Sequence, residues 1–449
     1  MASQVLVDYE RFWSQRAKDL PPNPFVGLLP LMRDPSTKVL CQGVPPDTTF
    51  PLQTVGFTLA DGTSVTLTVE ETRLAQRYPA FAWGPLREWL LKHINHIHSP
   101  SVGLDWDVAI AAGSMSSVDL VCAAFIDRGD IVLVESYSFM ASLDAFRSYG
   151  ARLEPIALDS EGLLPDALEK TCLRLQSNFQ KAKLLYTIPV GQNPTGSTLA
   201  LERYKQIYEL ARRFNLLIVE DDAYFYQQHT SRNLDMETDR DHVSKRQKVT
   251  CEQVDASLPG LQLGRTFLSI DTDGRVFRLD SFSKCLAPGF RLGWVSGARP
   301  LISKYNALAY ASSQNGCSLS MMLLGKMLEA WGDDGLEKHL LKLQLELRDG
   351  CNALIKAAEE HLGSVATWTR PKAGMFLWVE MKQAPRDREQ LLQLMQNNGI
   401  AVLPGEYCAA SIDSEQRCSF IRLSFVLQDE HYPEAMKRLA KLVSHVACD

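Results

Sequence analysis

The chain has 449 residues, of which 45% are hydrophobic and 22% are charged, and its formal net charge at pH 7 is -6. This balance is typical of a soluble globular protein, and the length exceeds one ordinary core, so two lobes are expected. A net negative charge gives no general electrostatic reason to bind nucleic acid or an anionic membrane, which favours small-molecule chemistry.

The ten cysteines lie at least ten residues apart, as at Cys408 and Cys418. Because no CxxC pair is present, the pattern predicts free thiols rather than a zinc site or a redox dithiol. The first 20 residues are charged and amphipathic, and no run of 18 apolar residues occurs in the chain. These features predict no signal peptide, no membrane span and a cytoplasmic protein.

Between residues 107 and 226, apolar runs of strand length alternate with segments of helical period. The predicted strands lie within 107–114, 130–139, 182–196 and 216–226, and the predicted helices within 116–129, 140–150 and 201–215. Strands that are apolar throughout and separated by helices indicate a parallel sheet covered on both faces. Ligands of such sheets bind beyond the carboxyl ends of the strands.

The last 100 residues change character and predict a smaller α+β lobe. Strands are expected at 373–381 and 418–426, and helices at 388–399 and 431–446. We therefore expect three parts: an N-terminal segment (1–55), a large domain (56–330) and a small C-terminal domain (331–449). Residues 228–264 are polar and without a clear period, which predicts a mobile surface insertion in the large domain.

Five motifs stand in a fixed order along the chain: "NPTG" (193–196), "EDDAY" (220–224), "SFSK" (281–284), "PGFRLGW" (288–294) and "IRLSF" (421–425). Over about residues 25 to 445, the chain resembles the fold-type I pyridoxal phosphate enzymes, specifically the class I aminotransferases. It is most similar to the branch that holds fungal aromatic aminotransferases and kynurenine and 2-aminoadipate aminotransferases. The resemblance implies an α/β fold with a mostly parallel seven-stranded sheet, a smaller α+β domain and pyridoxal 5′-phosphate as cofactor.

The resemblance assigns catalytic roles to Lys284, Asp221 and Tyr224. Lys284 resembles the family's Schiff-base lysine, and a buried amine with a lowered pKa suits imine formation and proton transfer. Asp221 matches the carboxylate that keeps the pyridine nitrogen protonated. Tyr224 and Asn193 match the donors to the phenolic oxygen of the ring. The acids beside Asp221, Glu220 and Asp222, are expected to be capping or solvated groups.

The remaining cofactor contacts also follow from the resemblance. Tyr137 resembles the aromatic ring that stacks on the cofactor, although a plain core tyrosine would look much the same. The phosphate is expected at a glycine turn, a helix start and a fixed cation, which correspond to Gly113, Ser114, Met115, Ser281 and Arg291. Tyr78 aligns with a tyrosine that reaches the phosphate of the neighbouring subunit, so a homodimer is expected.

Arg422 lies inside the apolar strand "FIRLSF", where an arginine is costly to bury unless it binds a carboxylate. We expect it to bind the α-carboxylate of the substrate, together with Asn193 and Gly43. The N-terminal stretch that should line the side-chain pocket is apolar at Phe25, Val26, Leu28 and Leu29, with Arg33 nearby. This lining favours aromatic amino acids over dicarboxylates as substrates.

Other interpretations stay open at this point. The same cofactor and fold can serve 2-aminoadipate or kynurenine transamination, other chemistry at Cα or Cβ, or a non-catalytic sensor domain. His93, His96 and His98 lie close in sequence, but they do not share one helix face and no carboxylate or thiol completes a shell, so no metal is expected.

Overall fold

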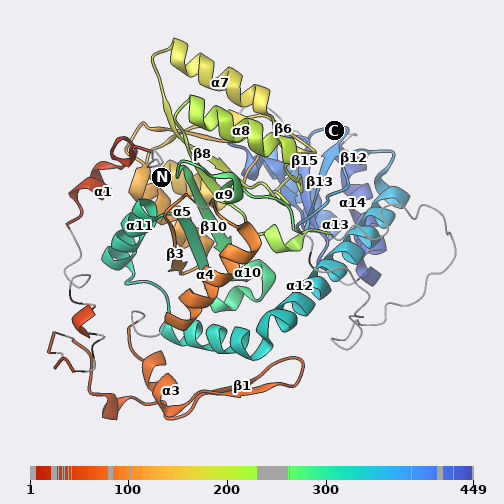
Figure 1. The fold of residues 1–449 in the computed structure, drawn as a ribbon. Coiled ribbons are helices and arrows are strands. Elements are labelled where there is room, and N and C mark those ends of the chain that lie inside the picture. Colours follow the sequence, from red (N-terminus) through yellow and green to blue (C-terminus); the bar gives the residue numbers. More distant parts are fainter. Residues whose placement is uncertain are drawn as a thin grey trace. The chain divides into compact units, whose positions relative to one another are not determined.

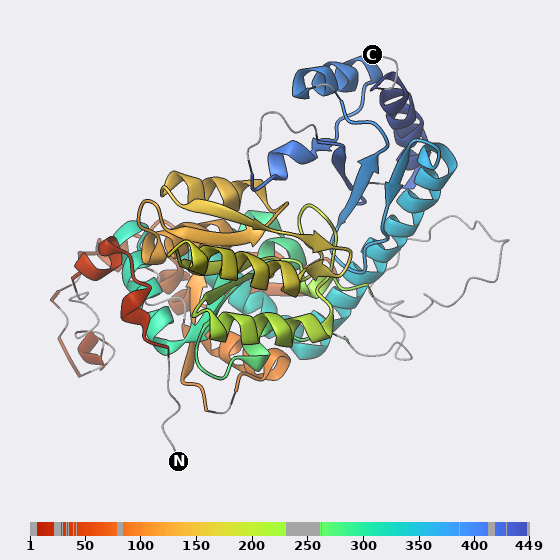
Figure 2. The same cartoon turned by 90° about the horizontal axis from the view of Figure 1, so that it is seen from above.

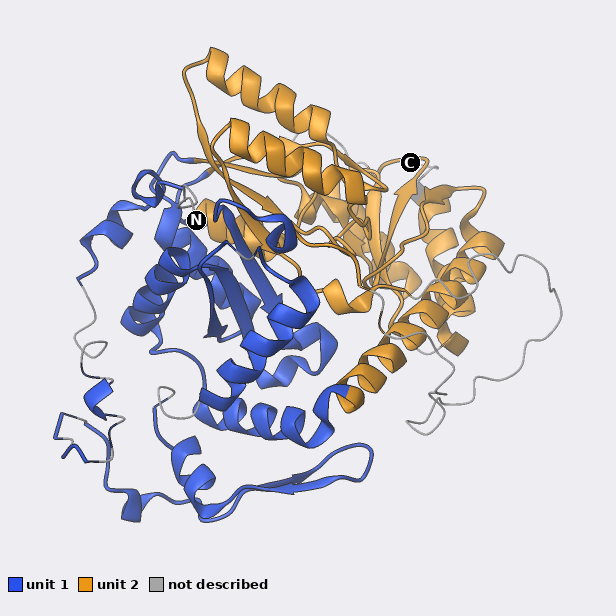
Figure 3. Ribbon diagram, in the orientation of Figure 1, with its two compact units in different colours: residues 1–130, 148–151, 267–333 blue, residues 131–147, 152–266, 334–449 orange. Residues whose placement is uncertain are grey.

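The structure is a computed structural model (Figure 1). It describes residues 7–446 except 22–27, 29, 33, 35, 39, 42, 79–83, 102, 230–260, 262, 386, 412–417 and 428. The chain packs into two compact units, which Figure 3 colours separately. Unit 1 holds residues 1–130, 148–151 and 267–333, and unit 2 holds 131–147, 152–266 and 334–449. The domain boundaries expected from the sequence stay a prediction, and most of the expected insertion, 228–264, lies outside the described residues.

Unit 1 contains the strands and helices around the "SFSK" motif. Its elements are α1 (Gln15–Asp19), β1 (Gly56–Thr58), β2 (Ser64–Thr66), α3 (Val69–Ala75), α4 (Gly84–His98), β3 (Trp106–Ala111), α5 (Ser114–Phe125), α9 (Phe267–Ile270), β10 (Val276–Ser281), α10 (Phe282–Cys285), β11 (Gly293–Ala298) and α11 (Arg299–Ser312). The helices α5 and α11 pack against each other and against β11.

Unit 2 contains the remaining strands of the large sheet and the C-terminal sheet. Its elements are β4 (Ile131–Glu135), α6 (Met140–Ser148), β5 (Arg152–Ile156), β6 (Leu158–Asp159), β7 (Gly162–Leu163), α7 (Pro165–Ser177), β8 (Ala182–Thr187), α8 (Leu201–Arg213), β9 (Leu217–Asp221), β12 (Ala366–Trp368), β13 (Phe376–Met381), α13 (Arg388–Asn398), β14 (Leu403–Pro404), β15 (Phe420–Ser424) and α14 (Tyr432–Val446). The long helix α12 (Ser318–Leu362) begins in unit 1 and ends in unit 2. The helices α7 and α8 lie side by side (Figure 1).

The large sheet has seven strands in the order β3-β11-β10-β9-β8-β4-β5. The neighbours among β9, β8, β4 and β5 pair in parallel, as the alternation of strands and helices predicts. β11 instead pairs antiparallel with both β10 and β3. The link from β10 to β11 spans only residues 282–292, which is too short for a helical crossover, so the chain must turn back. This short link contains Lys284 and Arg291.

The C-terminal sheet has four antiparallel strands in the order β12-β13-β15-β14, which confirms the strands and helices expected in this region. One face of β13 and β15 is buried with the second half of α12 and with α14, in a core that includes Leu354, Leu377, Ile421 and Leu439. Figure 2 shows α12 running beside this sheet. Because side chains alternate along a strand, the opposite face presents Phe376, Trp378, Glu380, Phe420 and Arg422.

Candidate active site

The start of α5 in unit 1 is shaped to receive an anion. β3 ends at Ala111 and α5 begins at Ser114, and Gly113 between them has φ +88°. This φ favours glycine, and a Cβ at Gly113 would lie 2.8 Å from Nη2 of Arg291, so a side chain there would displace the guanidinium. The guanidinium of Arg291 therefore lies directly beside the first turn of α5. A fixed cation at a helix N-terminus is a favourable site for a phosphate group.

Lys284 lies in the same region of unit 1. Ser281 ends β10 and caps α10, where its hydroxyl accepts a hydrogen bond from the backbone N–H of Ser283 at 3.1 Å. Across the strands, Ser281 is paired with Gly293, and Gly293 with Ala111. The expected phosphate ligands and Lys284 thus come from neighbouring strand ends within one unit. Lys284 is half-buried there.

For the other site residues expected in unit 1, the structure gives the position in the fold and the exposure. Ser114 and Met115 are the first two residues of α5 and are both half-buried. Tyr78 follows α3 and is 52% exposed, so its side chain is accessible in the single chain. A Cβ at Gly43 would meet no atom within 4 Å, and the substrate contact expected there stays a prediction. Of the expected apolar lining, only Leu28 lies within the described residues, whereas Phe25, Val26, Leu29 and Arg33 lie outside them.

In unit 2, Asp221 is the last residue of the buried strand β9, and its carboxylate accepts a hydrogen bond from a buried tyrosine. The hydroxyl of Tyr186 donates to Oδ2 of Asp221 at 2.6 Å and lies 2.9 Å from Oγ of Ser142. Tyr186 is fully buried. A donor on a buried carboxylate stabilises its ionised form and fixes its orientation. Tyr186 could not be predicted from the sequence, because nothing in "LLYT" distinguishes it from a core tyrosine.

The acids that flank Asp221 are not solvated. Glu220 and Asp222 are 0% and 1% exposed, so the expectation that they are solvated is wrong, whereas a capping role stays a prediction. β9 is buried on both faces, and strand alternation therefore does not turn Glu220 towards water, while Asp222 is buried directly after the strand.

Arg422, Asn193 and Tyr224 form one connected group in unit 2. Nη1 of Arg422 donates to Oδ1 of Asn193 at 2.7 Å, and Nδ2 of Asn193 donates to the hydroxyl of Tyr224 at 3.1 Å. The guanidinium also lies 4.1 Å from the ring centre of Phe376. Burial lowers the pKa of Arg422. The Asn193–Pro194 peptide bond is cis, although the general preference of such bonds predicts trans.

Tyr137 lies beside two other aromatic rings of unit 2. Its ring centre is 5.3 Å from that of Trp378 and 5.4 Å from that of Phe420. The backbone carbonyl of Tyr137 accepts a hydrogen bond from Nε2 of Gln192 at 2.7 Å. Through Gln192, Tyr137 is therefore connected to the turn that carries Asn193. Its expected stacking on the cofactor stays a prediction.

Glu135 is a buried acid that the sequence analysis did not single out. Its carboxylate accepts hydrogen bonds from Nε2 of Gln192 at 2.9 Å and from the hydroxyl of Thr187 at 2.5 Å. Burial raises the pKa of Glu135 to about 7, although both hydrogen bonds act in the opposite direction. The apolar run "IVLVE" could have indicated a buried acid, since it ends a strand without any polar residue before it.

The raised pKa of Glu135 predicts a change of stability with pH. An unfolded glutamate ionises near 4.5, whereas the folded carboxyl keeps its proton until about 7. Between these values the folded state binds more protons, so this group lowers the free energy of unfolding by about 3 kcal/mol as the pH rises from 4.5 to 7. Glu135→Gln should remove this loss, as measured by urea unfolding from pH 5 to 8. The matched control Glu202→Gln, an exposed helix residue, should follow the wild type, and equal slopes for all three proteins would contradict the role of Glu135.

The histidines of α4 have structural surroundings. The ring of His93 stacks on Trp89, with 4.5 Å between ring centres, and burial lowers its pKa to about 4. His98 is 2% exposed. Within the described ranges, no group of histidine, cysteine, aspartate or glutamate residues is arranged to hold a metal ion. The same part of the chain has no helix that is both long and apolar enough to cross a membrane.

Comparison with known protein families shows to which family the chain belongs. The family model "Aminotransferase class I and II" matches residues 39–439, which is most of the chain. The chain belongs to this family, and it is an aminotransferase. The aminotransferase thus has the fold that the five ordered motifs imply.

Two curated relatives show the range of activities around this aminotransferase. "Aromatic amino acid aminotransferase C569.07" of Schizosaccharomyces pombe is 33% identical over 77% of this chain and 73% of its own length. "Kynurenine/alpha-aminoadipate aminotransferase, mitochondrial" of Bos taurus is 30% identical over 90% of this chain and 91% of its own length.

Solved structures agree with the fold of the aminotransferase. Aminotransferase Aro8 from Candida albicans superposes with a TM-score of 0.81 at 26% identity and covers 98% of this chain and 99% of its own. Pyrococcus horikoshii kynurenine aminotransferase, solved in complex with PMP and with kynurenine as a substrate, gives a TM-score of 0.70 at 28% identity, with 98% of each chain covered.

Proposed function

We propose that this aminotransferase uses pyridoxal 5′-phosphate to move an amino group between an aromatic amino acid and a 2-oxoacid. The observation that carries the proposal is the burial of the Arg422 guanidinium without any described carboxylate partner. Its guanidinium is half-buried and is hydrogen-bonded only to the neutral amide of Asn193, with no carboxylate partner among the described residues. A desolvated guanidinium with free donors is a binding site for the α-carboxylate of a substrate.

The residues present fit the proposed cofactor. The anion site made by the start of α5 and Arg291 suits the phosphate, and the space that a Cβ at Gly113 would fill lies between them. Asp221 suits the ring nitrogen because a buried carboxylate held by Tyr186 is a strong partner for a protonated ring. Asn193 and Tyr224 would donate to the phenolic oxygen. The kynurenine aminotransferase of Pyrococcus horikoshii, whose structure contains PMP, supports this assignment.

Each of these side chains has its own role in the proposed transamination. The bound cofactor supplies an aldehyde and a ring that accepts electrons. Asp221 holds a proton at the ring nitrogen. The amine of Lys284 would hold the cofactor through its aldehyde group and, when it is free, would move the proton at Cα of the substrate. Arg422 holds the α-carboxylate and so orients that Cα–H bond.

The substrate class is tested with a panel of amino donors. With 2-oxoglutarate as acceptor, phenylalanine, tyrosine, tryptophan and kynurenine should give higher kcat/KM than 2-aminoadipate. An apolar lining gains from burying an aromatic side chain, whereas a distal carboxylate without a partner pays a desolvation cost. Formation of the matching 2-oxoacid separates transamination from other chemistry at Cα or Cβ. A higher kcat/KM for 2-aminoadipate than for every aromatic donor would support the alternative activity named for the bovine relative.

The proposal includes a homodimer in which Tyr78 contacts the cofactor phosphate of the other subunit. Its 52% exposure in the single chain leaves the hydroxyl accessible to a partner. Tyr78→Phe should speed the loss of cofactor during dialysis, because one hydrogen bond to the phosphate is removed. Tyr407→Phe, at another exposed tyrosine (38%), is the matched control and should retain cofactor like the wild type. Full activity in a protein that sedimentation shows to be monomeric would contradict the dimer.

We also propose a cytoplasmic location, because the cysteines among the described residues are free thiols, as expected in a reducing compartment. The bovine relative is named mitochondrial, so cell fractionation with a tagged full-length chain is the direct test.

A further inference from the structure

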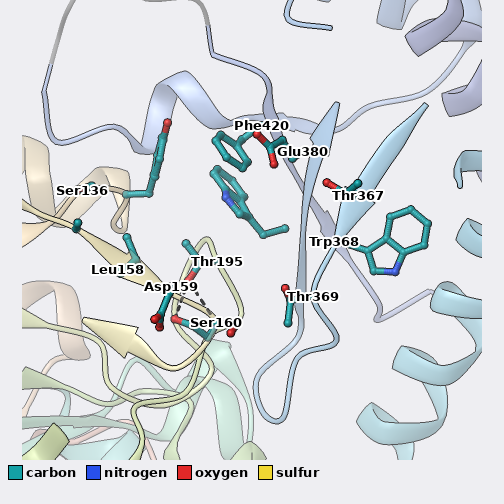
Figure 4. Close-up of a pocket in the computed structure, with 14 residues that line it drawn as sticks. Ser136, Leu158, Asp159, Ser160, Thr195, Thr367, Trp368, Thr369, Glu380 and Phe420 are labelled. Atoms are coloured by element: carbon teal, nitrogen blue, oxygen red, sulfur yellow. Dashed lines mark hydrogen bonds between the residues drawn. The ribbon is translucent and has the colours of Figure 1, made fainter. Parts of the chain in front are cut away.

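Unit 2 contains a cavity of about 480 Å³, and Tyr137 is the one residue of its lining to which a role has been given above. Ser136, Asp159 and Thr195 line one side of the cavity, and Thr367, Thr369 and Glu380 line the other, as Figure 4 shows. Its volume is within the range of small-molecule sites.

One wall of the cavity is aromatic. Trp378 and Phe420 stack with 5.2 Å between ring centres and 6° between ring planes, and Tyr137 packs against both. The strand register explains this grouping, since Glu380 is paired with Phe420 and side chains alternate along β13. Trp378, Glu380 and Phe420 therefore share the face opposite the buried core. Such a wall offers ring faces, which attract a cation.

The charged groups of the lining all have one sign. It includes the carboxylates of Asp159 and Glu380 and no lysine, arginine or histidine. Asp159 is already bound by Arg203, at 2.6 and 2.8 Å. The side chain of Glu380 makes no hydrogen bond or ion pair with any other described residue, and it lies next to Phe420 (Figure 4). A ligand that carries a carboxylate would be repelled here, whereas an ammonium group would find a partner.

We propose that this cavity is a second binding site of the protein, for an aromatic amine that carries an ammonium group and no carboxylate. The ring of the ligand packs on Trp378 and Phe420, and its ammonium group pairs with the carboxylate of Glu380. Arg422 is paired with Trp378 on the same face of the sheet, but it is not part of the lining of this cavity and belongs to the group that is expected to bind a carboxylate. The proposal does not depend on the proposed substrate or cofactor.

Three probes with the same indole ring test this proposal by calorimetry: tryptamine (amine only), indole-3-propionate (carboxylate only) and tryptophan (both groups). Tryptamine should bind, and indole-3-propionate should bind at least about tenfold more weakly. In Glu380→Gln the affinity for tryptamine should fall about fivefold, as expected when one partly exposed ion pair is lost. Glu389→Gln, at an exposed residue of α13, is the control and should not change it.

Kinetics with an amino acid substrate separate the cavity from the transamination site. Glu380→Gln should keep kcat and KM within about twofold, because Glu380 has no role in the proposed reaction. If tryptamine instead binds only where the substrate binds, Glu380→Gln will leave its affinity unchanged and tryptophan will compete with it fully. Either of these results, an absence of tryptamine binding, or equal binding of indole-3-propionate would overturn the second site.

The aromatic wall has its own test. Phe420→Leu keeps an apolar side chain of similar volume but removes the ring face, so the affinity for tryptamine should fall about threefold. Phe179→Leu, at a phenylalanine that is 99% exposed, is the matched control. An unchanged affinity in Phe420→Leu would show that the wall does not contact the ligand.

Discussion

Lys284→Ala should abolish transamination, with a loss of at least about 10⁴-fold in kcat, because the amine is expected both to bind the cofactor covalently and to move the Cα proton. The variant should also lose the visible absorption that a lysine-bound cofactor gives to the wild type. Borohydride reduction followed by mass spectrometry should place the cofactor on the peptide that contains Lys284 in the wild type and on no peptide of the variant.

The control for this result is Lys205→Ala, at an exposed residue of α8. It should keep both the colour and the activity of the wild type. An unchanged visible spectrum in Lys284→Ala would reject the covalent role, whatever the activity of the variant. This measurement is independent of the substrate, so it also stands if the aromatic preference is wrong.

Asp221→Asn should keep the cofactor bound but lower kcat by about 10²- to 10³-fold. The amide has the same shape as the carboxylate, yet it cannot keep the ring nitrogen protonated, so electrons from Cα are accepted poorly. KM should change much less than kcat, because Asp221 is not expected to contact the substrate. Near-normal turnover would refute the assignment.

Tyr186→Phe provides a graded comparison for the same site. It removes the 2.6 Å hydrogen bond to Asp221 and leaves the carboxylate in place, so kcat should fall by about tenfold, with a changed pH profile. Tyr208→Phe, at a buried tyrosine of α8, controls for the loss of a tyrosine hydroxyl elsewhere in unit 2. If Tyr186→Phe and Tyr208→Phe give the same kinetics, Tyr186 has only a structural role.

The order of short motifs was enough to identify the family and to name Lys284, Asp221, Asn193 and Arg422 as candidates. Each motif is short and predicts local structure, because a few neighbouring residues determine a turn, a helix start or a strand end. The continuous apolar runs likewise predicted β4, β8 and β9 correctly, since a strand buried on both faces needs apolar residues at every position.

The tertiary structure decided which side chains support these candidates. Tyr186 and Asp221 are 35 positions apart, and Trp378 and Phe420 are 42 positions apart, so no local pattern could pair them. The burial of Glu220 and Asp222 also depends on what packs on both faces of β9 rather than on their own type. Likewise, burial raises the pKa of Glu135, and the hydrogen bonds from Gln192 and Thr187 lower it in part.

The sequence by itself therefore determined the family, and it predicted the cofactor and the residues that are expected to carry the chemistry, because short contiguous motifs contain this information. Only the tertiary structure decided the partners of Asp221, the isolation of Arg422 from any described carboxylate, and the cavity bounded by Tyr137, Trp378 and Phe420. The physical reason is the distance along the sequence between the residues that interact. Backbone turns and strand burial are settled by neighbours in sequence, whereas hydrogen bonds, desolvation and cavity walls are settled by residues that only folding brings together.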